Sequence, residues 1–146
     1  MPRRDTPPPS ARIRPPHLDP RLVLVVAAGG AVGTAGRYSL TTTLGVETAL
    51  PYATLAENVL GAFLLGLLLE GLVRRGPETP THRTVRLAMG TGVLGGFTTY
   101  SALSIELERL LVGGDLGAAA LYAVATVVLG LGACAAGVLL GTRRGR

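Results

Sequence analysis

The sequence predicts an all-α integral membrane protein with four transmembrane helices, the third of them broken near its middle. Only 16% of the 146 residues are charged, well below the roughly 25% that is typical of soluble domains. The stretch from Leu116 to Thr142 carries no charge and is longer than the ~20 residues that a helix needs to cross a bilayer. Glycine and alanine are frequent in the apolar stretches, as expected where helices pack closely in lipid.

Apolar stretches follow one another along the chain, each with few charges. The first is interrupted only by Arg37, and the second contains Glu57 and Asn58. The third has no charged residue between Leu87 and Ile105. We therefore expect one four-span domain over residues 21–142, with spans at approximately residues 21–44, 51–73, 85–109 and 116–141.

The two ends of the chain differ in composition from the spans. Residues 1–20 combine arginines with repeated prolines, a composition that cannot bury a core, so a disordered tail is expected there. Residues 143–146 are expected to form a short basic tail.

The 14 basic residues are all arginines, and 12 of them flank the spans. The net charge of +5 therefore describes membrane flanks, and we expect no nucleic-acid partner. Arginines accumulate on the cytoplasmic side of membrane proteins, so both termini are predicted to lie in the cytoplasm, with the chain in the cell membrane. These flanking residues are Arg3, Arg4, Arg12, Arg14, Arg21, Arg74, Arg75, Arg83, Arg86, Arg143, Arg144 and Arg146.

The inventory of reactive side chains argues against an enzyme. Cys134 is the single cysteine, and His17 and His82 are the only histidines. These residues cannot supply a cysteine-rich zinc site or the usual sets of metal ligands. No nucleophile and base pair or phosphate-binding loop is recognisable either.

The third span contains a cluster of glycines followed at once by the polar run Thr98–Ser101. Non-helical backbone at membrane depth is tolerated only where protein covers it or where it lines a cavity, so an interruption here indicates a site. Free carbonyls at such a break suit a small hard cation, whereas amides and hydroxyls suit an anion. The alternative is that the glycines only allow close helix packing.

Polar side chains inside spans are costly and mark candidate sites. Besides Arg37, Glu57 and Asn58, these include Tyr122 and Thr126, which share one face of the fourth span because they are four residues apart. An isolated threonine hydroxyl more often bonds to a carbonyl of its own helix.

Three stretches resemble the CrcB/Fluc family of fluoride channels, and the resemblance extends from about Leu22 to Gly141. Residues 29–38 resemble the Gly-Gly-x-x-Gly-x-x-x-Arg-Tyr of the family's first span. Residues 54–66 resemble its Thr-Leu-x-x-Asn-x-x-Gly-x-Phe-x-x-Gly, and residues 92–101 its broken third span, Gly-x-x-Gly-Gly-x-Thr-Thr-Phe-Ser.

The resemblance implies an antiparallel dimer that lets fluoride leave the cytoplasm passively, with a structural Na⁺ at the interface. Carbonyls of Gly95 and Thr98 would hold this ion, and Arg37 would lie in a vestibule. By position, the fluoride pathway would be lined by Asn58, Thr99, Tyr100, Ser101, Leu103, Tyr122 and Thr126. Donor groups and the positive edges of aromatic rings would replace the water around the anion.

Several positions depart from the family pattern. Tyr100 and Leu103 stand where the family has two phenylalanines, and Glu57 stands where it usually has an apolar residue. The strong arginine bias favours a single orientation, so we expect pairing with an oppositely oriented homologue, a homodimer being the alternative.

Two further interpretations remain open at this point. One is a proton-coupled exporter of the small multidrug type, in which Glu57 would exchange protons. The other is a partner subunit that does not itself conduct fluoride.

Overall fold

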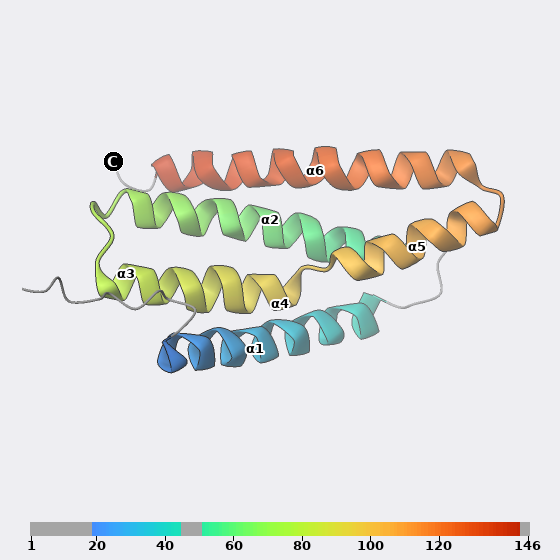
Figure 1. Ribbon diagram of the computed structural model, residues 1–146. Coiled ribbons are helices and arrows are strands. Elements are labelled where there is room, and N and C mark those ends of the chain that lie inside the picture. The colour runs from blue at the N-terminus through green and yellow to red at the C-terminus, as the bar shows by residue number, and fades with distance from the viewer. Residues whose placement is uncertain (1–18, 45–50, 144–146) are drawn as a thin grey trace, which may run out of the picture.

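The computed structural model describes residues 19–44 and 51–143, and in these residues every regular element is a helix. Helices α1 (Pro20–Leu44), α2 (Tyr52–Val73) and α6 (Leu116–Arg143) are each long and apolar enough to cross a membrane. They lie side by side with a further rod that consists of several shorter pieces (Figure 1). The expected class, an all-helical membrane protein, is confirmed.

The composite rod contains α3 (Pro80–Val85), the π-helical η2 (Arg86–Leu94), α4 (Gly95–Phe97) and α5 (Tyr100–Val112). It begins before the predicted residue 85 because Thr79 caps it: the Thr79 hydroxyl accepts a hydrogen bond from the His82 amide at 3.1 Å. Proline at the first helical position suits such a start. The last helical residue of the rod is Val112, beyond the predicted residue 109, and Gly113 caps it.

The predicted tails lie almost entirely outside the described residues. Pro20, assigned to the N-terminal tail from the sequence, is the first residue of α1, as proline's fixed φ allows. Arg143, assigned to the C-terminal tail, is the last residue of α6. Residues 1–18 and 144–146 of the two predicted tails are not among those described.

Glycines allow the helices to approach closely. Helix α1 packs along η2 and α4, and α2 packs along α6. A Cβ atom on Gly33 would collide with the Val93 carbonyl, and one on Gly96 would collide with the Gly30 carbonyl. Small residues at such contacts are the usual way in which membrane helices associate. The backbone of α1 is thereby held directly against the rod that contains the break.

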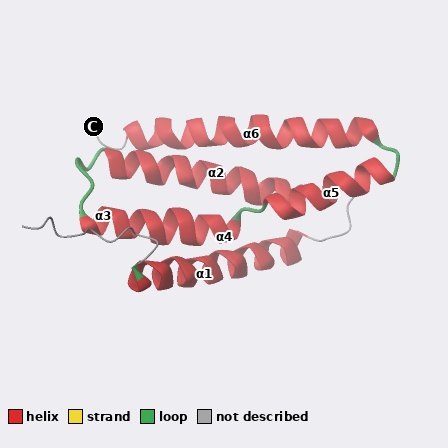
Figure 2. Cartoon of the chain, in the orientation of Figure 1, coloured by secondary structure: helices red, strands yellow, loops and turns green. Residues whose placement is uncertain are grey.

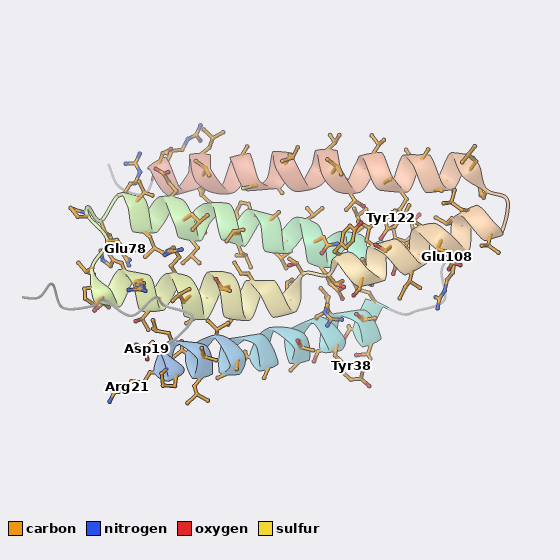
Figure 3. The ribbon with its side chains drawn as sticks, viewed as in Figure 1. Asp19, Arg21, Tyr38, Glu78, Glu108 and Tyr122 are labelled. Carbon is orange, nitrogen blue, oxygen red and sulfur yellow. The ribbon has the colours of Figure 1, made fainter. Side chains whose placement is uncertain are left out.

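Within the described residues, most arginines lie at one end of the helix bundle, whereas Arg37 and Arg109 lie toward the other. Helices α1 and α5 run in one direction and α2 and α6 in the other (Figure 1). Arg21 lies at the same end as Glu78, whereas Tyr38 and Tyr122 lie toward the opposite end (Figure 3). Two ion pairs join basic residues to acidic ones at the arginine-rich end, Arg74 with Glu70 at 2.7 Å and Arg86 with Glu78 at 2.9 Å.

Candidate functional site

The composite rod is non-helical at Thr98 and Thr99, which Figure 2 shows as a loop between α4 and α5. Both residues have extended backbone angles, φ −77° and ψ 156° at Thr98 and φ −147° and ψ 121° at Thr99. The Thr99 hydroxyl caps α5 by accepting the Ala102 amide at 3.2 Å. The local sequence thus supplies its own cap for the helix that restarts after the break.

The side chain of Asn58 on α2 makes two hydrogen bonds to the backbone of Thr99 in the break. Its Oδ1 accepts the Thr99 amide at 2.8 Å, and its Nδ2 donates to the Thr99 carbonyl at 3.0 Å. The side-chain amide therefore takes the place of a neighbouring peptide group, as in a β ladder. Because a primary amide has two N–H groups, one N–H of Asn58 remains for another acceptor.

The break leaves two carbonyls without their helical donors. In a continuous helix the Gly95 and Thr98 carbonyls would accept the amides of Thr99 and Ala102. Those amides donate instead to Asn58 Oδ1 and to Thr99 Oγ1. The two carbonyls predicted to hold Na⁺ are therefore among those that the break releases, and neutral oxygen ligands of this kind suit a hard cation.

Arg37 reaches the same break from α1. Its Nε donates to the Gly96 carbonyl at 3.3 Å, and the Thr34 hydroxyl approaches the same oxygen at 3.4 Å. The side chain is half-buried. Arg37 therefore contacts the backbone between the two released carbonyls.

A cluster of carboxylates and hydroxyls lies on the opposite side of Asn58 from the arginine-rich end. Glu106 on α5 accepts hydrogen bonds from the Thr54 hydroxyl at 2.6 Å and from the Tyr122 hydroxyl at 2.7 Å. Glu57 on α2 is bonded to the Thr41 hydroxyl at 2.5 Å. The cluster thus joins side chains of α1, α2, α5 and α6.

The remaining predicted pathway residues divide into an exposed and a buried group. Tyr100 is 82% exposed and Ser101 is also exposed, whereas Leu103 is half-buried. Tyr122 and Thr126 are buried inside the subunit, 4% and 8% exposed. The Thr126 hydroxyl bonds to the Tyr122 carbonyl of its own helix at 2.8 Å, which is the local bonding that the sequence also allowed.

Sequence reasoning missed Thr41, Thr54 and Glu106. Glu106 lies within the predicted third span, directly after the uncharged run that ends at Ile105, and it was not among the predicted site residues. A carboxylate inside a predicted span is itself a signal for a site. The two threonines gave no comparable signal, because their hydroxyls are partners of carboxylates that are distant in the sequence.

Fold and site together define a class: a helical protein with three candidate membrane spans and a composite rod whose interrupted backbone and polar neighbours form a candidate ion site. The chain belongs to the family described as CrcB-like protein, Camphor Resistance (CrcB), whose profile matches residues 24–138. The resemblance found in the three sequence stretches is thereby confirmed.

Curated relatives extend the match over nearly the whole chain. Fluoride-specific ion channel FluC 2 of Leifsonia xyli subsp. xyli is 47% identical over 131 residues, 90% of each chain. Fluoride-specific ion channel FluC of Deinococcus radiodurans is 49% identical over 127 residues, 84% of this chain and 96% of the relative. The protein of the same name from Phenylobacterium zucineum is 42% identical over 127 residues, 83% and 95% of the two chains.

Proposed function

We propose that this chain is a subunit of a fluoride-specific ion channel in the cell membrane, through which fluoride leaves the cytoplasm. The observation that carries the proposal is its 42–49% identity, over more than four fifths of its length, to three proteins of that name. A channel needs no coupling ion, because the inside-negative potential drives an anion outward. The exporter interpretation of Glu57 has no support in these comparisons.

The proposed fluoride pathway passes the break and the outer part of α5. Asn58 offers its remaining N–H, and the hydroxyls of Thr99 and Ser101 lie 3.2 Å apart, where either can donate to an anion. Donors of this kind compensate a small anion for its lost water. The pathway residues would be Asn58, Thr99, Tyr100, Ser101, Leu103, Tyr122 and Thr126, with Arg37 in the vestibule.

The carbonyls of Gly95 and Thr98 are the proposed ligands of a structural Na⁺. The redirection of their helical donors to Asn58 and Thr99 supports this assignment. Gly95 is exposed at the surface of the subunit, so a second subunit can supply the remaining oxygen ligands. The bound ion would neutralise the negative ends of the carbonyl dipoles at the break.

The functional unit would be an antiparallel dimer in which the composite rod completes the fourth membrane crossing of each subunit. The exposure of Tyr100 supports a partner on this face, because its hydroxyl would otherwise face hydrocarbon without a hydrogen-bond partner. The arginine-rich end would face the cytoplasm. That strong bias favours a homologue of opposite orientation as the partner.

Fluoride efflux from liposomes tests the proposal. The chain is reconstituted alone and together with a homologue encoded beside it, and efflux is followed with a fluoride electrode, with chloride as the control ion. Efflux that requires both chains supports the heterodimer, and efflux from this chain alone supports the homodimer. Efflux that requires the partner and is unchanged by substitution of Asn58 and Tyr100 would identify a non-conducting subunit. Absence of efflux in both preparations would contradict the proposed function.

A further inference from the structure

The two carboxylates of the site, Glu57 and Glu106, lie in different environments. Glu57 is 1% exposed and is the largest fully buried side chain among the described residues. Glu57 directly precedes Asn58, whose side chain bonds to Thr99 in the break. We infer that Glu57 binds a proton and is held as a neutral carboxylic acid, and that this proton determines how readily an anion passes Asn58. The transport part of this inference rests on the proposed function, whereas the proton site does not.

The hydrogen count at Thr41 accommodates the neutral form. Thr41 Oγ1 lies 3.1 Å from the Arg37 carbonyl and 2.5 Å from Glu57 Oε1. A threonine hydroxyl has one hydrogen, so it can donate to only one of these two oxygens. If it donates to the carbonyl, the second contact is satisfied only when Glu57 carries a proton and donates to Thr41 Oγ1. A protonated Glu57 therefore makes both contacts hydrogen bonds, whereas an ionised Glu57 would have this single hydroxyl as its donor among the described residues.

The burial of Glu57 favours its neutral form. An ionised carboxylate removed from water needs several donors or a paired cation. Thr41 is the single side chain that the described residues place within hydrogen-bond distance of Glu57. The Arg37 guanidinium is within electrostatic range of Glu57, but its Nε is bonded to the Gly96 carbonyl and the pair does not approach to ion-pair distance.

Glu106 provides the contrast. Its two oxygens accept hydrogen bonds from two hydroxyls, those of Thr54 and Tyr122, whereas Glu57 contacts a single hydroxyl among the described residues. Glu106 and Glu57 are also close enough for their charges to repel each other. Simultaneous ionisation of both carboxyl groups is therefore opposed.

The state of Glu57 would then control anion passage. While Glu57 is neutral, the residue next to Asn58 adds no negative charge to the surroundings of the N–H that Asn58 offers to an anion. When alkaline conditions remove the proton, a negative charge appears one residue away and repels the anion. The charged groups that face Glu57 are Arg37 from α1 and Glu106 from α5, with the Tyr122 phenol from α6. Efflux through this subunit should therefore fall as the pH rises.

Infrared spectroscopy of the purified, assembled protein tests the proton site without any transport. The wild type should show the carbonyl stretch of a buried carboxylic acid near neutral pH, and the band should disappear at alkaline pH. The substitution Glu57→Gln should abolish this band. Glu108→Gln, at an exposed position of the same α5 that carries Glu106 (Figure 3), should leave it in place. A spectrum in which Glu57→Gln removes no such band between about pH 5 and about pH 8 would overturn the assignment.

Fluoride efflux between about pH 6 and about pH 9 tests the consequence. One unit charge about 10 Å from the ion, at an effective dielectric constant of about 20, corresponds to a change on the order of tenfold. We expect wild-type efflux to fall by about that factor across its titration, while Glu57→Gln stays at the acid rate throughout. Identical pH profiles for wild type and Glu57→Gln would overturn the transport role. If no preparation conducts fluoride, the proposed function fails and the infrared result still decides the proton site.

Discussion

Replacing Asn58 with alanine should destabilise the protein more than the loss of an ordinary side-chain hydrogen bond. The substitution removes the bonds of 2.8 Å and 3.0 Å to the Thr99 amide and carbonyl. Interhelical hydrogen bonds in membrane proteins average only about 0.6 kcal/mol, because the unbonded groups find other partners. Thr99 is fixed in an extended conformation and half-buried, so each of its two backbone groups is left unpaired at a cost of about 1–3 kcal/mol. We therefore expect Asn58→Ala to lower the free energy of unfolding by about 2–6 kcal/mol, the sum for the two groups.

Denaturant unfolding in detergent micelles, followed by circular dichroism, provides the measurement. Asn58→Asp keeps an acceptor for the Thr99 amide but places a carboxylate oxygen opposite the Thr99 carbonyl, so it should not restore stability. Ser104→Ala is the matched control, because the Ser104 hydroxyl bonds only to the Tyr100 carbonyl of its own helix at 3.0 Å. That control should change stability by less than about 0.5 kcal/mol. An Asn58→Ala protein as stable as the control would refute the view that Asn58 holds the break.

Two further predictions concern the surroundings of the break. Gly61→Ala should destabilise the protein by about 1–3 kcal/mol, because a Cβ at Gly61 would collide with Thr98 Cγ2. Gly71→Ala should be tolerated, because no atom lies near its Cβ position. The same unfolding assay measures both variants, and equal stability of the two would contradict the prediction. Replacing Na⁺ by a large organic cation should weaken subunit association if the Gly95 and Thr98 carbonyls bind the ion, as measured by single-molecule dissociation in lipid. Association that is independent of Na⁺ would remove the proposed cation site.

Local features of the sequence indicated the membrane class. The uncharged stretch that became α6 needs no knowledge of the other helices, because length and apolarity alone decide whether a helix can span. The π-helical geometry of η2 was not predicted. The glycines of that segment are compatible with an interruption, with a close helix contact and with a widened helical turn. The sequence does not say which of the three forms.

The partners of the site could not be predicted from the sequence in the same way. Asn58 was recognised as a polar residue in a span, but its pairing with Thr99 joins residues 41 positions apart. Glu106 was overlooked, and its bond to Tyr122 depends on how α5 lies against α6. Such pairings arise from helix packing, which periodicity along one chain does not specify.

The break and the proposed anion site depend on the same side chain. Extended backbone inside a membrane span must find hydrogen-bond partners within the protein, and Asn58 supplies both a donor and an acceptor to Thr99 while retaining one N–H. Aspartate lacks the donors, and serine offers a single hydrogen. An amide at this position can therefore stabilise the break and still present a donor to a passing anion. Protonation of the neighbouring Glu57 would preserve the ability of Asn58 to bind an anion, since a negative charge on the adjacent residue would repel that anion.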